Sequence, residues 1–371
     1  MHKKIYELNY TMDDLQDSDI VVRHANLKSK CWVVRPGSRY RFINNFLEMG
    51  CIAMAHLDDS SPDEDVFEVL RDAKGEDVFT VCDAIEPNLT INVRGQVLSF
   101  LKEMAVGDVV FTLSGSNIYP GIMSGDPYVA SQAFSDSERF IVRRSVTWGD
   151  PIERSKIPVT LAKSFHAYQA IFSLGDNSKE IHHWLSAFFV SEGTYYSSLR
   201  VNQAGDLSHH SLKNLSEVMD RLQVLSLMIG DKEGFDLSND LVTLETLLDV
   251  MKRFDRESLL VLTSQQVMMS PGDIWYGFKS NSLRSGVAFL VGLALLFNQT
   301  IAFADPELER IKEDVTPVIA QNLPAVKDNV DLEAVKQALW VKPAGQNRSF
   351  VDQEPSPELF PQDGTPRYSS R

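Results

Sequence analysis

Residues 285–304 read SGVAFLVGLALLFNQTIAFA, and the uninterrupted apolar run Gly286–Phe297 constrains the fold more than any other feature. Such a run has to leave water, either in a protein core or in a bilayer. Twenty residues at about 1.5 Å each can just cross the hydrocarbon layer. Lys279 and Arg284 before the segment, and acidic residues after it, fit a transmembrane helix with a cytoplasmic N-terminus. The strict run has only about a dozen residues, a length typical of a buried or oligomer-interface helix, so both interpretations stay open.

The size and charge of the chain limit its class. It has 371 residues, of which 43% are hydrophobic, which suits a globular protein with two domains. A formal net charge of −15 argues against a chain that coats nucleic acid indiscriminately. Lysine and arginine nevertheless gather in residues 21–50, where Glu48 is the one acid. The sequence therefore leaves room for a single basic patch on an acidic protein.

The cysteines and the N-terminus indicate a compartment. Cys31, Cys51 and Cys82 are odd in number and lack the spacing of metal ligands, which favours a reducing interior. The first residues, MHKKIYELNY, lack the apolar run of a signal peptide. We therefore expect the N-terminal domain in the cytoplasm, with residues 285–304 as a candidate anchor in the inner membrane.

Short β-rich segments follow one another over residues 28–178, most of them bounded by Gly, Asp or Pro. We predict strands at 31–35, 52–55, 109–113, 118–124, 140–148, 158–165 and 168–172, and helices at 42–50 and 89–104. Several strands around a helix-rich insertion predict a small β-barrel with α elements.

The sequence pattern changes after residue 178. Residues 179–284 predict a smaller α/β domain, with strands at 195–201 and 258–263 and helices at 208–229 and 241–254. The remaining predicted segments are an N-terminal extension (1–27) with a short strand at 20–22, the apolar helix (285–304), a helical segment (305–340) and a disordered tail (341–371) rich in Pro, Gln, Ser and Asp. The predicted fold class is α+β, with a barrel followed by an α/β domain, an apolar C-terminal helix and this tail.

Five pieces of the first domain resemble a known family in their order. They are Trp32–Gly37 (WVVRPG), Phe42–Ala53, Met104–Val110 (MAVGDVV), Gly121–Tyr128 (GIMSGDPY) and Arg143–Trp148 (RRSVTW). This succession resembles an EVE-type PUA-like domain, in the version that opens Mrr-type restriction and other prokaryotic phage-defence proteins. The likeness covers under half of the chain. It implies a PUA/EVE-like barrel that senses nucleic acid or a modified nucleobase.

The resemblance also implies a binding pocket. A barrel that reads a base needs a flat face for stacking and polar groups for the base edge. The candidate binding residues are Trp32 and Trp148 for the face, Ser114, Ser116 and Asn117 for the edge, Arg35, Arg39 and Arg144 for phosphate, and the turn residues Gly37 and Ser38. A structural interpretation stays open beside this one, because large aromatic side chains are mostly buried and residues 114–117 can form a plain hairpin turn.

The sequence offers no catalytic or metal site. A restriction-type nuclease needs a carboxylate and an acid-x-Lys pair around a divalent metal, and the chain has no Glu-x-Lys. Its Asp72-Ala73-Lys74 lies in an acidic insertion, away from a convincing strand. The adjacent histidine pairs, at 182–183 and 209–210, point to different faces and lack companion ligands. We therefore expect no enzyme activity, no metal and no cofactor.

Three functions remain open. The leading prediction is a non-catalytic sensor of nucleic acid in a prokaryotic defence system, a homo-oligomer whose C-terminal part acts at the membrane. The second is a soluble nucleic-acid-binding module with a dimerising C-terminal half. The third is a degenerate restriction-like nuclease, against which the missing acid-x-Lys argues.

Overall fold

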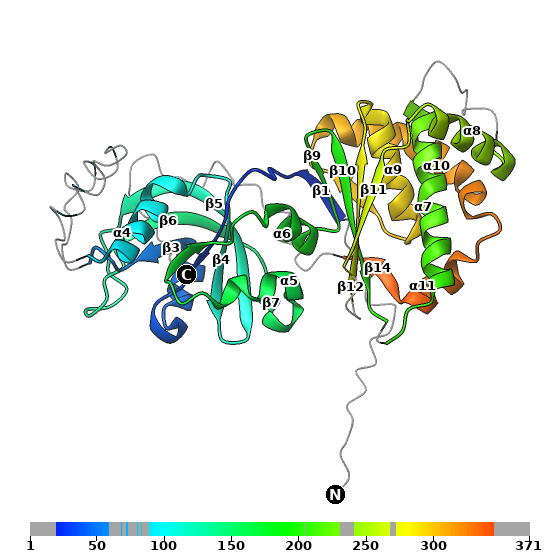
Figure 1. Ribbon diagram of the computed structural model, residues 1–371. Coiled ribbons are helices and arrows are strands. Elements are labelled where there is room, and N and C mark those ends of the chain that lie inside the picture. Colours follow the sequence, from blue (N-terminus) through cyan, green and yellow to red (C-terminus); the bar gives the residue numbers. More distant parts are fainter. Residues whose placement is uncertain are drawn as a thin grey trace, which may run out of the picture. The chain divides into compact units, whose positions relative to one another are not determined.

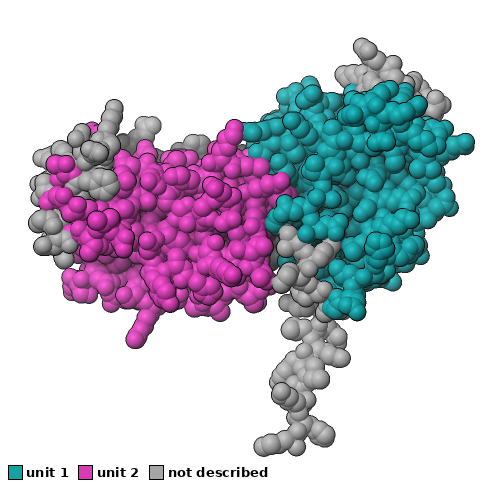
Figure 2. Space-filling model, viewed as in Figure 1, with its two compact units in different colours: residues 1–24, 187–343 teal, residues 25–186, 344–371 magenta. Residues whose placement is uncertain are grey.

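The computed structural model describes residues 20–58, 89–203, 205–230, 241–267 and 272–344, together with positions 68, 72, 80 and 83 (Figure 1). The chain divides into two compact units, which are coloured separately in Figure 2. Unit 1 comprises residues 1–24 and 187–343, and unit 2 comprises residues 25–186 and 344–371. Each unit has its own β-sheet, so the fold is mixed α+β. The Asp72-Ala73-Lys74 triplet as a whole, Cys82 and residues 345–371 of the predicted tail lie outside the described residues. The first residues of that predicted tail, Val341–Pro343, form a strand.

Unit 2 is built on a sheet with the strand order β3-β6-β5-β4-β2-β8, to which β7 adds by pairing with β5. These strands are β2 (Cys31–Val34), β3 (Cys51–Met54), β4 (Val109–Ser114), β5 (Asn117–Val129), β6 (Val142–Trp148), β7 (Ile152–Glu153) and β8 (Ile171–Ser173). The two edge strands of the described sheet, β3 and β8, do not pair with each other. The structure therefore shows an open sheet and not the closed small barrel that the sequence analysis predicts.

The helical elements of unit 2 are short. They are α1 (Ile43–Glu48), α4 (Ile91–Leu98) with a π-helical continuation (Ser99–Glu103), α5 (Val159–Ala162) and α6 (Ser178–Leu185), with 3-10 turns at Ser38–Tyr40, Arg154–Lys156 and Ser164–His166. The prediction of a strand at 158–165 is wrong, because α5 and a 3-10 turn occupy this segment. Pro158 precedes the first turn of α5, where its fixed φ and missing N–H are tolerated.

Strand β2 separates two hydrophobic cores of unit 2. Trp32 and Val34 pack into one of them, and Cys31 and Val33 into the other. This division follows from the alternation of side chains across a strand. The same alternation places Arg35, which follows β2 directly, on the side of Cys31 and Val33. That side carries the pocket described below.

Unit 1 has the strand order β11-β12-β10-β9-β1-β13, with β14 paired to β10. Its strands are β1 (Ile20–His24), β9 (Phe188–Ser191), β10 (Thr194–Val201), β11 (Leu262–Val267), β12 (Gly272–Lys279), β13 (Ile301–Phe303) and β14 (Val341–Pro343). Its helices are α7 (His209–Gly230), α8 (Leu244–Arg256), α9 (Leu283–Leu296), α10 (Pro306–Lys327) and α11 (Leu332–Leu339). Strand β1 pairs in parallel with both β9 and β13, so residues predicted as an extension are part of this sheet. Figure 1 shows α7, α9 and α10 on one side of it.

The apolar segment forms α9, which packs into the core of unit 1 against α7 and α10. The helix has only 14 residues, and Val287 to Leu290 are entirely shielded from solvent. Among the described residues, no helix combines the length and apolarity that crossing a bilayer requires. The predicted transmembrane segment at 285–304 and its inner-membrane anchor are therefore wrong. The segment is also not a C-terminal apolar helix, because β13, α10, α11 and β14 follow it.

The contact between α9 and β10 gives a stability prediction. A Cβ atom added at Gly286 would lie 1.9 Å from Cε2 of Tyr195, whose side chain is fully buried. Gly286→Ala should therefore destabilise unit 1 by about 1–3 kcal/mol, the typical cost of overpacking, although alanine is the better helix former. Hydrogen exchange of unit 1 peptides in denaturant measures this loss.

Gly95→Ala is the matched control, because Gly95 lies in α4 and a methyl group added there would meet nothing within 4 Å. This variant should keep or raise the stability of unit 2, since alanine has the higher helix propensity. If Gly286→Ala is as stable as the wild type, α9 does not pack on Tyr195 as described.

Candidate functional site

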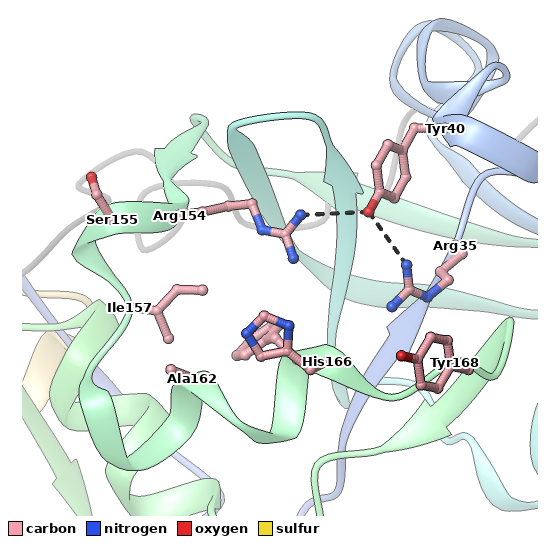
Figure 3. A pocket seen from close by; sticks show the side chains of 9 residues that line it. Arg35, Tyr40, Arg154, Ser155, Ile157, Ala162, His166 and Tyr168 are labelled. Carbon is pink, nitrogen blue, oxygen red and sulfur yellow. Dashed lines mark hydrogen bonds between the residues drawn. The ribbon is translucent and has the colours of Figure 1, made fainter.

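A pocket of about 640 Å³ opens in unit 2 on the Arg35 side of the sheet (Figure 3). Its volume lies within the range of about 300–1,000 Å³ that is usual for small-molecule sites. The lining residues are Arg35, Tyr40, Arg154, Ser155, Ile157, Ala162, Phe165, His166 and Tyr168. They come from the end of β2, from the loop after it, and from the segment between β7 and β8.

The guanidinium of Arg35 is fixed by backbone carbonyls. Its Nη2 donates to the carbonyl oxygen of Ala167 at 2.6 Å, and its Nε donates to that of Gln169 at 3.2 Å. Its Nη1 donates to the hydroxyl of Tyr40 at 3.3 Å. These bonds hold the planar group in one orientation and also fix the backbone on both sides of Tyr168.

The loop after β2 brings Tyr40 to this guanidinium through unusual backbone angles. Gly37, Arg39 and Tyr40 have φ values of 75°, 55° and 60°, in the left-handed region. Non-glycine residues there cost of order 1–3 kcal/mol and persist where the surroundings enforce them. Hydrogen bonds from the amide of Gly37 to the carbonyl of Arg35 (2.9 Å) and from that of Phe42 to Pro36 (3.0 Å) close the loop.

Arg154 reaches the same hydroxyl from the other side. Its backbone amide donates to the carbonyl of Ser116 at 2.7 Å, which ties it to the turn between β4 and β5. Its Nη1 donates to the carbonyl of Gly115 at 3.2 Å and to the hydroxyl of Tyr40 at 3.4 Å. Figure 3 shows the two guanidinium groups on either side of the Tyr40 hydroxyl.

The electrostatics of this arrangement favour an anion. Within the part of the chain that the structure describes, neither Arg35 nor Arg154 forms an ion pair with a carboxylate. Their bonds to Tyr40 are long beside the usual value of about 2.9 Å, although the donors are charged. Burial raises the pKa of Tyr40, but the hydrogen bond from Arg154 and the charges of Arg154 and Arg35 outweigh it, so the pKa is lowered. Two positive groups therefore converge on an acceptor that does not neutralise them.

Three of the sequence-predicted site residues have interior roles. Trp32 is 1% exposed, and its Nε1 donates to the carboxylate of Asp108 at 2.8 Å. Arg144 is also 1% exposed, and its Nη1 donates to the carbonyl oxygens of Phe100 and Met104 at 3.0 and 2.7 Å. Trp148 packs partly buried against the same core as Trp32. In this structure these groups present no surface to a ligand in the pocket.

The other predicted residues lie around the pocket or beside it. Arg35 lines it, and Gly37, Ser38 and Arg39 form the loop that carries Tyr40, with Ser38 and Arg39 exposed. Ser114, Ser116 and Asn117 flank the hairpin turn that holds the backbone of Arg154, and their side chains are not among the pocket lining. Of the predicted binding residues, only Arg35 is among those that line the pocket.

The sequence analysis missed Tyr40, Arg154, His166 and Tyr168. Side-chain alternation along β2 was one available signal, since it separates Arg35 from Trp32. Tyr40 lies in a 3-10 turn after β2, and Arg154, His166 and Tyr168 lie between β7 and β8, where the sequence analysis did not predict the helical turns. Among the described residues, no group of three or more His, Cys, Asp or Glu side chains is arranged to hold a metal ion. His182 and His183 lie on α6, and burial lowers the pKa of His183 to about 3.

Comparisons of the chain with family models, with curated proteins and with solved structures find no match. The likeness to an EVE-type PUA-like domain therefore stays a prediction, and the functional argument has to be made from the pocket.

The interior position of Trp32 leads to a second prediction. Asp108 is 4% exposed and accepts hydrogen bonds from Trp32 and, at 3.0 Å, from the amide of Ala105. Trp32→Phe leaves this buried carboxylate short of one donor, which should cost about 1–3 kcal/mol of unit 2 stability. Denaturant unfolding followed by hydrogen exchange of unit 2 peptides measures the loss, and Trp148→Phe provides the comparison at a less buried ring. A stable Trp32→Phe variant with weakened nucleotide binding would instead place this ring at the ligand.

The Tyr40 hydroxyl gives a third prediction. Because its pKa is lowered, Tyr40 should ionise before an ordinary tyrosine as the pH rises, as observed by NMR of ¹³C-labelled tyrosine. Saturating phosphate should shift this ionisation to higher pH, since a bound anion opposes a second negative charge. The signal is assigned by its loss in Tyr40→Phe. An ionisation at the ordinary pH, unmoved by phosphate, would contradict the convergence of the two guanidiniums.

Proposed function

We propose that unit 2 is a non-catalytic binding module for nucleic acid, which holds a phosphate group in the pocket. The observation that carries this proposal is the convergence of Arg35 and Arg154 on one hydroxyl, without an ion-pair partner among the described residues. Arginine is the usual residue for this task, because its fork of donors matches the oxygens of a phosphate.

A phosphate satisfies this site better than a carboxylate does. It has enough oxygens to accept from both guanidiniums and from the hydroxyl of Tyr40. Arg35 is fixed by the carbonyls of Ala167 and Gln169, and Arg154 by that of Gly115. Little side-chain entropy is therefore lost when the anion binds, which improves affinity.

The overall negative charge of the protein means that long-range attraction does not contribute to this binding. A net charge of −15 repels a polyanion at long range, so affinity has to come from direct contacts. Each phosphate contact to a single strand changes the logarithm of the binding constant by about −0.7 per unit of log salt. The proposal therefore implies a shallow salt dependence, equivalent to one or two contacts and unlike that of a protein that coats DNA.

The wider role follows the resemblance and is part of the proposal. The proposed role is that of a sensor of nucleic acid in prokaryotic defence. Homo-oligomerisation through unit 1 remains a prediction, as does the degenerate nuclease. A membrane-spanning effector is not part of the proposal, because Leu283–Leu296 form the core helix α9.

A matched pair of variants tests the proposal. Arg154→Gln should weaken binding of a fluorescent single-stranded oligonucleotide by about tenfold or more, since a charge-assisted hydrogen bond contributes about 1.5–3 kcal/mol. It should also reduce the salt slope by about 1. Arg39→Gln removes the same charge from an exposed residue outside the pocket lining, so we expect little change in affinity. Fluorescence anisotropy at several salt concentrations measures both quantities.

Two results would overturn the proposal. One is a wild-type protein that binds no oligonucleotide even at low salt. The other is an equal loss of affinity in Arg154→Gln and Arg39→Gln, which would assign the effect to general charge and not to the pocket.

A further inference from the structure

The ring of Tyr168 lines the edge of the pocket and is fully exposed to solvent. Its exposed fraction is 102%, the highest among the large hydrophobic and aromatic residues that are exposed in the described part of the chain. No hydrogen bond or ring contact joins its side chain to another described residue. Burial of an aromatic ring is favourable, so a ring left fully in water offers an unused stacking surface.

The backbone beneath this ring is firmly held. The guanidinium of Arg35 restrains the segment, because it donates to the carbonyls on both sides of Tyr168, at Ala167 and at Gln169. Phe165, 1% exposed, anchors the segment in the core on one side. On the other side, the amide of Ile171 donates to the buried Oε1 of Gln96 at 2.9 Å. The position of the backbone that carries the ring is therefore set by the fold.

The same bonds set Tyr168 beside the phosphate site. Arg35 is the shared group, since it donates both to the Tyr168 segment and to the hydroxyl of Tyr40. Figure 3 shows the Tyr168 ring next to Arg35, with the ring of His166 in the same wall of the pocket. A cationic anchor with an aromatic ring next to it matches the two ends of a nucleotide, which are a phosphate and a planar base.

Building on the proposed function, we infer that the pocket takes a single nucleotide, with its phosphate on Arg35 and Arg154 and its base stacked on Tyr168. The volume of about 640 Å³ leaves room for more than a phosphate ion. A paired duplex does not fit this recognition, because its bases are stacked on each other and their faces are covered. The nucleotide chemistry can come from a single strand or from a free nucleoside monophosphate.

The test compares five probes on the full chain: inorganic phosphate, adenosine, adenosine monophosphate, a single-stranded oligonucleotide and the matching duplex. Titration calorimetry should give tighter binding for the monophosphate than for phosphate or adenosine, since only the monophosphate fills both parts. The single strand should bind at least tenfold more tightly than the duplex. If the affinity for the single strand is much higher than that for the monophosphate, the ligand is a strand. If the two affinities are equal, the ligand is the free nucleotide. Both results support the inference.

Tyr168 is tested by substitution. Tyr168→Ala should weaken binding of the single strand and of the monophosphate about five- to a hundredfold, which is the range expected for loss of base stacking. Binding of inorganic phosphate should be unchanged. Tyr168→Phe should restore binding, because it keeps the ring. Trp340→Ala is the control, since it removes another exposed aromatic ring, in unit 1, and should leave binding unchanged.

The two proposals fail in different ways. If Arg154→Gln weakens binding while Tyr168→Ala binds both nucleotide probes like the wild type, the nucleotide inference is overturned and the phosphate site stands. Equal affinity for single strand and duplex overturns the inference in the same way. If the wild type binds neither phosphate nor any nucleotide probe, the proposed function itself is overturned.

Discussion

The hydrogen bonds of Arg35 determine how the pocket is put together. This residue follows directly on β2, the strand that separates the two cores of unit 2, so its position is set by buried neighbours on both faces. Its guanidinium then connects the loop with Tyr40 to the distant segment between β7 and β8, directly at the backbone around Tyr168 and, through the Tyr40 hydroxyl, at Arg154. A lysine could not replace it, because one ammonium group lacks the planar fork that reaches two carbonyls and a hydroxyl together.

Arg144 and Arg154 of unit 2 differ in the acceptors that they find. The buried Arg144 donates to the carbonyls of Gly125, Phe100 and Met104, and it thereby stabilises the junction of β5, β6 and the π-helical turn. Desolvation lowers its pKa, and the charges of Asp126 and Asp108 oppose this shift. Arg154 instead shares a weakly bonded phenol with Arg35 at an open pocket. Of these two residues, only Arg154 lines a pocket that a ligand can reach.

Local sequence patterns predicted the elements that are themselves local. The cluster of β-branched and aromatic residues before Pro36-Gly37 predicts β2, and the amphipathic pattern after residue 208 predicts α7. Pairings across the chain could not be predicted in this way. Strand β1, near the N-terminus, lies between β9 and β13, and nothing within residues 20–24 indicates those partners. Whether the edge strands β3 and β8 of the unit 2 sheet pair with each other is likewise a long-range property that local sequence patterns do not reveal.

The membrane prediction failed for a related reason. A helix that is apolar on all sides has the same composition in a bilayer as between a sheet and other helices. What distinguishes α9 is its surroundings, with Tyr195 of β10 against Gly286 and Leu222 of α7 against Gly292. Likewise, Trp32 carries the aromatic signal of a base-stacking residue, but its partner Asp108 makes it a core residue, and that partner is 76 positions away.

The pocket gathers features that reduce stability, and this supports a binding role. Two guanidiniums lie near each other without ion-pair partners among the described residues, Arg39 and Tyr40 adopt left-handed backbone angles, and the ring of Tyr168 is left in water. Each is unfavourable for the folded chain alone. At Trp32 and Arg144, by contrast, buried donors find acceptors within the protein. Unfavourable features that coincide at one pocket are expected where a ligand supplies the missing partner, because binding then relieves them together.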